Sequence, residues 1–406
     1  MGGFINRPVV FSVMTHHEFR KTRDIFITKD VFSENYSPEV PIERDDEIDE
    51  YMTALEDSLF GDQPSNILTY GKTGVGKTVV TKYVLNLLVE TATERDVDIE
   101  YFEVNCGSNQ TSYQVALSLL NKIRAQTGQS PLNRGYGFSE VMSRLYEQIE
   151  SLDATVYVMI DEIDYLGGDD RILYELPRAY KNGYLDTSFV GVIGISNDYS
   201  YRQNLSSKVK DTLQEREIRF PPYNASELQS ILRERASEGM KSGVVGNGVI
   251  EQCAALGARD TGSARQAIDL LREAGNVAEE ASAGEVEVSH VEHAKERVKR
   301  GRIRDGVTDL TDSGLMVLHA VASLARSGET PTRLKSIVSV YEEIATHYGR
   351  RPLGESRIRD HVGDLTMLGF VTEERKNLGR AGGQFYQYSL AVDSDLVYDV
   401  VSERLS

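Results

Sequence analysis

Short apolar runs alternate with segments of helical periodicity between about residues 46 and 222. The runs lie in "NILTYG", "IEYFEVNC", "TVYVMIDE" and "FVGVIGISN". Runs of this kind are typical of parallel strands, because helices cover both faces of a parallel sheet. The pattern therefore predicts an α/β domain over residues 49–222, preceded by an irregular arm over residues 1–48.

Helical spacing follows "FPPYN" at 220–224, a stretch that cannot continue a helix. The apolar positions of residues 223–304 predict a small all-α domain: Leu228, Ile231, Leu232 and Ala236, then Ala264, Ile268, Leu271 and Ala278, and finally Val291, Ala294 and Val298. The basic stretch "KERVKRGRIRDG" is expected to end the last helix and to run into a linker.

Residues 307–406 show helical spacing first and strand-like stretches afterwards. The apolar positions predict three helices, with Leu315, Leu318, Ala322 and Ala325 in the first, Ile337, Val338, Tyr341, Ile344 and Ala345 in the second, and Ile358, Val362, Leu365 and Leu368 in the third. Two strand-like stretches, "GFVTEERKN" and "GQFYQYSLAV", flank the glycine-rich turn "LGRAGG". Three helices and a β-hairpin indicate a winged helix.

The charge balance is strongly acidic. Against 45 Lys and Arg stand 63 Asp and Glu, so the net charge of the 406 residues is −18. Such a balance is unusual for a DNA-binding protein, whose affinity rests largely on neutralised phosphates. A cytoplasm rich in salt would screen the repulsion and favour hydrated carboxylates, so we predict a halophilic source. The basic residues also gather locally, with six against two acidic residues over 289–304.

Cysteines and hydropathy bear on the compartment. Cys106 and Cys253 are too few for a disulfide framework or a four-thiolate zinc site, which fits a reducing cytoplasm. No stretch approaches 18 apolar residues. We therefore expect a cytoplasmic protein without a membrane partner.

The stretch "TYGKTGVGKT" fits G-x-x-x-x-G-K-[ST] and lies between a predicted strand and a predicted helix. Glycines in such a loop allow backbone N–H groups to close on phosphate oxygens, and the helix N-terminus adds a favourable dipole. The lysine reaches the β- and γ-phosphates, and the threonine hydroxyl ligates Mg²⁺. The loop predicts a site for ATP or ADP with Mg²⁺, formed by Gly71, Lys72, Thr73, Gly74, Val75, Gly76, Lys77 and Thr78.

Polar residues follow two other predicted strands. Asp161 ends the apolar run "VYVMI" and is expected to complete the Mg²⁺ shell with Thr78, while Glu162 would polarise the attacking water as a general base. Asn197 ends the next strand, where it would orient water or the γ-phosphate. Arg265 lies in the first turn of a predicted helix, where the dipole opposes a cation, and this hints at an anionic partner.

These residues occur with further stretches in a fixed order: "VFSENYSPE", "GKTGVGKT", "VMIDEID", "GISND", "EIRFPPYNASELQSIL", "GSARQAIDLL" and "RPLGESRIRDHVGDLTMLGFV". Together they closely resemble archaeal origin-recognition initiators, the Orc/Cdc group of AAA+ ATPases, over about residues 20–392. The resemblance implies an AAA+ P-loop parallel sheet domain (α/β), an α-helical lid and a C-terminal winged-helix domain.

The resemblance also implies roles for individual residues. The arm around residues 31–41 would pack beside the adenine, Tyr223 would join the nucleotide site, and Asn197 and Arg265 become sensor 1 and sensor 2. A helical insertion that approaches DNA is expected within 107–136. Many relatives have arginine where "SKVKDTL" has Lys208 and Lys210, so the chain departs here from the family's pattern for a trans-acting arginine finger, and Arg202 and Arg216 are the alternative candidates.

The predicted third helix of the winged-helix domain points Ile358, Val362 and Leu365 inward. This leaves Arg357, Arg359 and His361 to contact double-stranded DNA, with Arg380 in the glycine-rich wing.

The combined prediction is an ATPase that binds origin duplex DNA and helps to recruit or load the replicative minichromosome maintenance helicase, with ATP and ADP as a switch. Self-association on DNA and a nucleoid-associated location in the cytoplasm fit this function. The alternatives are an AAA+ protein remodeller or clamp-loader-like ATPase, a winged-helix transcription regulator, and a paralogue that binds DNA without initiating replication.

Overall fold

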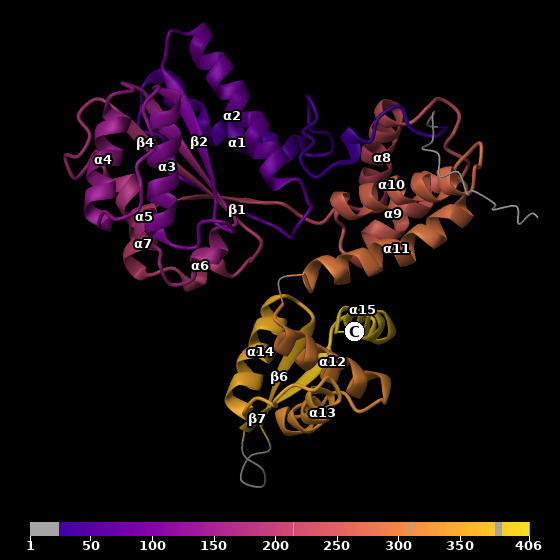
Figure 1. The fold of residues 1–406 in the computed structure, drawn as a ribbon. Helices are drawn as coiled ribbons and strands as arrows, with labels where there is room; N and C mark the ends of the chain where they lie inside the picture. The colour runs from indigo at the N-terminus through magenta and orange to yellow at the C-terminus, as the bar shows by residue number, and fades with distance from the viewer. Residues whose placement is uncertain (1–23, 214, 309, 378–383, 406) are drawn as a thin grey trace, which may run out of the picture.

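The computed structural model describes residues 24–405 except 214, 309 and 378–383. Figure 1 shows a sheet domain, a helical lid beside it and a smaller domain that follows the lid. This arrangement confirms the predicted fold class.

The sheet is parallel, and in the described residues it has five strands in the order β2-β3-β4-β1-β5. The strands are β1 (Ile67–Tyr70), β2 (Ile99–Asn105), β3 (Thr155–Asp161), β4 (Phe189–Ser196) and β5 (Arg216–Arg219). All side chains of β1 are buried, as are those of β3 up to Ile160. The four apolar runs are therefore strands, as predicted. The edge strand β5 was not predicted, because it is short and three of its four residues are exposed and charged.

Helices cover both faces of the sheet. One face packs against α1 (Asp45–Leu55) and α2 (Lys77–Glu94), and its core continues without interruption into the lid. The other face packs against α3 (Ser112–Gln126), α4 (Phe138–Glu150) and the short helices α5 (Arg171–Glu175), α6 (Tyr201–Asn204) and α7 (Ser207–Leu213). Short 3-10 helices lie at η1 (Asp30–Phe32), η2 (Glu56–Phe60), η3 (Ile163–Leu166) and η4 (Leu176–Arg178).

The lid consists of α8 (Ala225–Gly239), α9 (Val249–Asp260), α10 (Ala264–Glu280) and α11 (Val288–Gly306). Asn224 caps α8 in a capping box with Glu227, so "FPPYN" ends where the helix begins, as expected. Helix α9 was not predicted. The expectation for "KERVKRGRIRDG" was wrong in part, because α11 continues through these residues to Gly306 before the chain leaves the helix.

The C-terminal domain contains α12 (Asp312–Arg326), α13 (Leu334–His347) and α14 (Glu355–Met367), followed by an antiparallel hairpin of β6 (Val371–Asn377) and β7 (Gln384–Leu390). This is the predicted winged-helix arrangement. A further helix, α15 (Ser394–Leu405), was not predicted and packs against α12 and α11. The tip of the wing lies outside the described residues.

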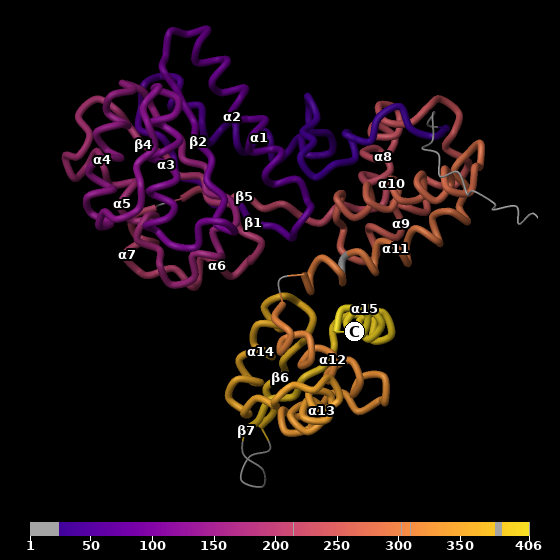
Figure 2. The backbone as a smooth tube through the Cα atoms, in the orientation of Figure 1, coloured from indigo at the N-terminus to yellow at the C-terminus, as the bar shows by residue number. Residues whose placement is uncertain are grey.

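The described part of the arm runs along the lid before it reaches α1. Figure 2 shows the indigo arm beside α8, and Phe26 and Phe32 are buried there. Added Cβ atoms on Gly275 and Gly239 would lie 2.4 and 2.3 Å from these rings, so the two lid glycines allow the close approach. The arm is therefore part of the lid core. No helix among the described residues is long and apolar enough to span a membrane.

Candidate nucleotide-binding site

A cavity of about 400 Å³ opens between the sheet domain and the lid. Its walls come from the loop 71–76 and α2, the ends of β2 and β3, the arm, and helices α8 and α10. Since β1, β3 and β4 are parallel neighbours, their carboxyl ends meet at this edge of the sheet. The predicted phosphate loop, the acidic pair and Asn197 therefore lie at one place.

Two glycines of the loop are required by geometry. Gly74 and Gly76 have φ angles of +80° and +94°, which L side chains rarely adopt. An added Cβ atom on Gly74 would lie 2.1 Å from the Ser263 hydroxyl, and one on Gly76 would lie 2.8 Å from the Tyr223 hydroxyl. The loop is thus packed directly against the lid and the segment that leads to it.

Lys77 begins α2, and only 6% of its surface is exposed. Its ammonium group donates hydrogen bonds to the carbonyl oxygens of Gly71 (2.7 Å) and Lys72 (2.9 Å) and to the side-chain oxygen of Asn197 (2.9 Å). Burial lowers the pKa of Lys77 to about 8, and the nearby carboxylates of Asp161 and Asp164 oppose this shift. The direct hydrogen-bond partners of the ammonium group are neutral oxygens, which phosphate oxygens could replace.

Thr78 and Asp161 are the predicted Mg²⁺ ligands. The Thr78 hydroxyl donates to the Asp161 carboxylate at 2.9 Å, and burial raises the pKa of Asp161. A hydroxyl and a carboxylate in contact, beside a phosphate loop, fit the usual protein share of a Mg²⁺ shell, which is completed by phosphates and water. Among the described residues no cluster of three or more His, Cys, Asp and Glu forms another metal site.

Glu162 adopts a left-handed backbone conformation with φ of +56°. This conformation costs free energy for a residue with a Cβ atom, and such strained residues are common at active sites. The Glu162 carboxylate reaches the end of β2, where it lies 2.7 Å from the position of an added Cβ on Gly107. It also lines the cavity, as a general base for water must.

Asn197 follows β4 and is held by Asp164, a residue that was not predicted. The Asp164 carboxylate accepts hydrogen bonds from the Asn197 backbone N–H (3.1 Å) and from the Ser196 hydroxyl (3.0 Å). The sequence offered a signal, since Asp164 is the last residue of "DEID". Asp164 therefore fixes the turn that carries Asn197 beside Lys77.

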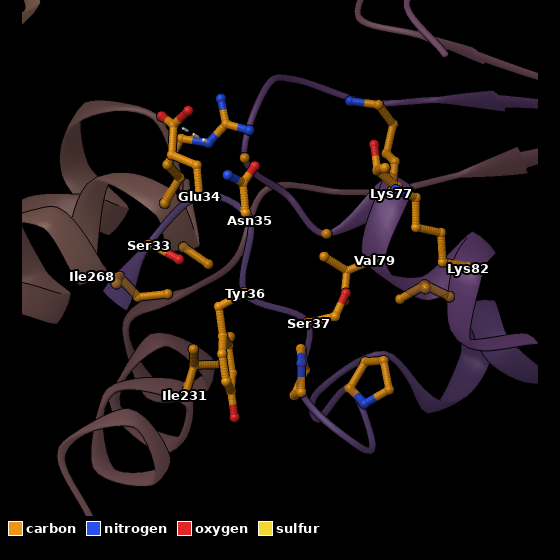
Figure 3. Close-up of a pocket in the computed structure, with 18 of the residues that line it drawn as sticks. Ser33, Glu34, Asn35, Tyr36, Ser37, Lys77, Val79, Lys82, Ile231 and Ile268 are labelled. Atoms are coloured by element: carbon orange, nitrogen blue, oxygen red, sulfur yellow. Dashed lines mark ion pairs between the residues drawn. The ribbon is translucent and has the colours of Figure 1, made fainter. Parts of the chain in front are cut away.

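Arg265 lies in the first turn of α10, as predicted, and its side chain forms an ion pair with Glu34 of the arm at 3.7 Å. The dashed line in Figure 3 marks this pair beside the label of Glu34. Both side chains line the cavity, with 47% of Arg265 and 65% of Glu34 exposed. The arm thus supplies a carboxylate to the arginine that was predicted to sense the γ-phosphate.

The arm and the lid form another wall of the cavity. Figure 3 shows arm residues, including Tyr36, between Ile231 and Ile268 of the lid and Val79 of α2. The Tyr36 hydroxyl donates to Glu238 at 2.6 Å, and the Arg235 guanidinium lies 4.4 Å from the centre of its ring. Tyr223 also lines the cavity but is 5% exposed. The arm lines the cavity, and its packing beside the adenine stays a prediction.

The described DNA-binding candidates lie on α14. Ile358, Val362 and Leu365 are buried, whereas Arg357 and Arg359 are exposed, and Arg359 pairs with Glu355 at 2.9 Å. His361 is less available, because its side chain is 22% exposed and lies 3.8 Å from Asp364. Arg380 lies outside the described residues.

Most of the other basic residues named from the sequence, the arginine-finger candidates and the basic stretch of α11, have carboxylate or carbonyl partners. Arg202 pairs with Glu215 and Glu217, and Lys210 on α7 donates to the Gln203 carbonyl. Arg216 is exposed on the edge strand β5. The basic stretch of α11 is also paired, with Arg297 on Glu273 and Glu280, and with Arg300 and Arg304 on Glu403 of α15.

A parallel sheet with a phosphate loop, an acidic pair after β3, an asparagine after β4 and a helical lid defines an AAA+ ATPase module, here joined to a winged helix. Family models agree with this class: the AAA domain matches residues 61–196, the Cdc6 AAA+ ATPase-type lid domain matches 229–296, and the CDC6 C-terminal winged helix domain matches 305–400. The chain belongs to the family of ORC1-type DNA replication proteins, as the following relatives show.

ORC1-type DNA replication protein 8 of Halobacterium salinarum is 49% identical over 95% of this chain and 98% of the relative. ORC1-type DNA replication protein 11 of Haloarcula marismortui is 41% identical over 93% of this chain and 91% of the relative. Both sources are halophiles, which supports the inference from the acidic composition. The ORC1 protein of Aeropyrum pernix, solved in complex with DNA, superimposes with a TM-score of 0.80 at 32% identity, covering 94% of this chain and 98% of that one.

Proposed function

We propose that this chain is an ATP-dependent replication initiator, which binds origin duplex DNA and helps to recruit or load the replicative helicase. The observation that carries the proposal is the convergence of Lys77, Thr78, Asp161 and Asn197 at a cavity that the lid residue Arg265 also lines. The family of ORC1-type DNA replication proteins sets the biological context.

The proposed ATPase chemistry uses the described side chains directly. Lys77 would exchange its carbonyl and amide partners for β- and γ-phosphate oxygens. Thr78 and Asp161 would hold Mg²⁺, which neutralises developing charge on the phosphates. Glu162 would polarise the attacking water, and Asn197 would orient it. Because Asn197 already contacts Lys77, the two side chains would part or share a phosphate ligand when nucleotide binds.

The proposed switch depends on the lid. Arg265 and the predicted adenine-binding wall belong to the lid and arm, whereas the phosphate loop belongs to the sheet domain. A nucleotide that contacts both parts can favour one lid angle, and loss of the γ-phosphate removes the contact of Arg265. ATP would therefore act more as a signal than as a fuel.

DNA binding is assigned to the winged helix, with Arg357 and Arg359 of α14 as groove or backbone contacts. The likeness to the Aeropyrum pernix ORC1 protein solved with DNA supports this assignment. Because neutralising phosphates releases counterions, DNA affinity is expected to fall as salt rises, even where salt stabilises the fold. Self-association on DNA would follow from adjacent binding sites.

The test is genome-wide DNA occupancy of the tagged protein, measured beside a Lys77→Ala variant. Sharp peaks where replication starts, reduced in the variant, are expected. Peaks confined to promoters and unaffected by Lys77→Ala would instead favour a winged-helix regulator. Flat occupancy with DNA-independent ATP turnover would favour a remodeller or a clamp-loader-like ATPase.

A further inference from the structure

Arg44 is a buried arginine at the end of the arm, immediately before α1, and only 3% of its surface is exposed. Its guanidinium donates three hydrogen bonds, to the Val75 carbonyl (Nε, 3.1 Å), to the Glu47 carboxylate (Nη1, 3.0 Å) and to the Pro221 carbonyl (Nη2, 2.8 Å). A buried charge is tolerated only with such partners. Nothing in the sequence patterns above pointed to this residue.

The three acceptors belong to different parts of the molecule. Val75 lies in the phosphate loop, Glu47 in α1, and Pro221 in the segment 220–224 that connects the sheet domain to the lid. Residues 44 and 221 are 177 positions apart. One planar group therefore joins the loop that would hold the phosphates to the connection about which the lid would turn.

The ring of Tyr223 completes this arrangement. The Arg44 guanidinium lies 3.6 Å from the centre of the Tyr223 ring, and the Tyr223 hydroxyl reaches Gly76 of the loop. The Tyr223 N–H also donates to the Gly262 carbonyl at 2.9 Å. Two residues after Gly262, the Ala264 N–H donates to the Gly74 carbonyl, also at 2.9 Å. The beginning of α10 is thereby bound to the same loop.

We propose that Arg44 is a positioning residue that couples the phosphate loop to the lid, so that the lid angle follows the state of the loop. The inference rests on the nucleotide switch proposed above. Each hydrogen bond has little room to lengthen before it is lost. A shift of Val75 when phosphates bind must therefore move the guanidinium, and with it the connection at Pro221, or break one of these bonds.

Lysine cannot replace arginine here, because an ammonium group has no planar fork with donors in three fixed directions. Arg44→Lys keeps the charge beside Glu47 but cannot hold both carbonyls in this geometry. The variant therefore separates coupling from simple charge neutralisation. Arg233→Lys is a matched control on the lid, since Arg233 is exposed and pairs with Glu251 on the lid surface.

The experiment measures the distance between the sheet domain and the lid in the full chain. Spin labels are placed at Ser143→Cys on α4 and Ala255→Cys on α9, both exposed positions. The native Cys106 and Cys253 are fully buried, and burial raises the pKa of both thiols to about 12, so they compete little for the label. Distance distributions are recorded without nucleotide, with ADP and with a non-hydrolysable ATP analogue.

We expect two distinct distances for the wild type with ADP and with the analogue. Arg44→Lys should give one broad distribution that does not respond to the γ-phosphate, while nucleotide affinity falls less than about fivefold and Arg233→Lys behaves as the wild type. A wild-type response in Arg44→Lys would refute the inference alone. A wild type with no response would refute the proposed nucleotide switch itself.

A second pair of variants decides the matter if Arg44→Lys does not fold. Glu47→Gln retains an oxygen that accepts from Nη1, whereas Glu47→Ala removes it and frees the guanidinium to turn. The inference requires the response to persist in Glu47→Gln and to shrink by at least half in Glu47→Ala. Equal behaviour of the two variants, in either direction, would overturn it.

Discussion

The ammonium group of Lys77 lies 2.9 Å from the side-chain oxygen of Asn197, although 120 residues separate them in the sequence. The contact joins the first helix after the phosphate loop to the end of β4. It is one of three hydrogen bonds that the buried ammonium group donates. It also means that the two residues must part, or share a ligand, when nucleotide binds.

The pH dependence of nucleotide binding should reflect Lys77. Its pKa is about 8 in the free protein, and phosphate charges would raise it, so binding takes up a proton above pH 8. Affinity should therefore fall about tenfold between pH 7 and pH 9. Calorimetry in buffers of different ionisation enthalpy measures the proton uptake. Lys77→Arg, which stays charged, should bind with no such slope.

The lowered pKa of Lys77 also makes the free energy of unfolding depend on pH, and here the free energy rises with pH while nucleotide affinity falls. A lysine whose folded pKa is lowered binds fewer protons when folded than when unfolded, between pH 8 and its ordinary range. The contribution of Lys77 to the free energy of unfolding should therefore rise with pH across this interval. Denaturant titrations of the wild type and of Lys77→Met would show a difference in slope, and parallel curves would contradict the assignment.

Glu162→Gln should separate binding from hydrolysis. The amide cannot accept a proton from water, so turnover is expected to fall by roughly 10²–10⁴-fold while ATP affinity changes little. Single-turnover hydrolysis and equilibrium binding test the two parts. Glu103→Gln is the matched control, because Glu103 lines the same cavity but pairs with Lys82 at 2.7 Å. Equal losses in both variants would exclude Glu162 as the general base.

Glu34→Gln should sharpen the discrimination between ATP and ADP. If Arg265 contacts the γ-phosphate as proposed, Glu34 would compete for it, and an exposed ion pair is worth about 0.2–1 kcal/mol. ATP affinity should therefore rise by about 1.5- to 5-fold, with ADP affinity unchanged. In an Arg265→Ala background the substitution should have no effect. A gain that persists there would show that Glu34 acts on the nucleotide by another route.

The sequence predicted the parts of the fold and site that depend on local pattern. The buried strands, the phosphate loop and Asp161 carry their signals within a few residues. Strand β5 was not predicted because it is short and three of its four residues are charged and exposed. Asp164, Glu34 and Arg44 were not predicted for a different reason. Each makes a contact with a residue distant in the sequence, 33, 231 and 177 positions away respectively, and no periodicity encodes such contacts.

The DNA-binding assignment predicts a change in salt dependence. Replacing Arg357 and Arg359 together by alanine removes two candidate phosphate contacts, so the slope of log affinity against log salt should decrease by about 2. Fluorescence anisotropy with origin duplex over a salt series measures the slope. Arg259→Ala on the lid is the control, since Arg259 is 64% exposed but lies far along the chain from α14. An unchanged slope in the double variant would place the DNA interface elsewhere.

Salt should stabilise this protein even though it screens ion pairs that the structure contains. The net charge of −18 leaves many carboxylates without cations, and at 1 M salt their repulsion acts over only about 3 Å. Pairs such as Arg304 with Glu403 oppose this trend, because the same screening weakens them. We expect the repulsion to dominate, so that the melting temperature rises from dilute buffer into molar KCl. Glu403→Gln should steepen the rise by removing the opposing pairs of α11 with α15. A melting temperature that falls steadily with KCl would show instead that ion pairs govern stability and that the halophilic interpretation is wrong.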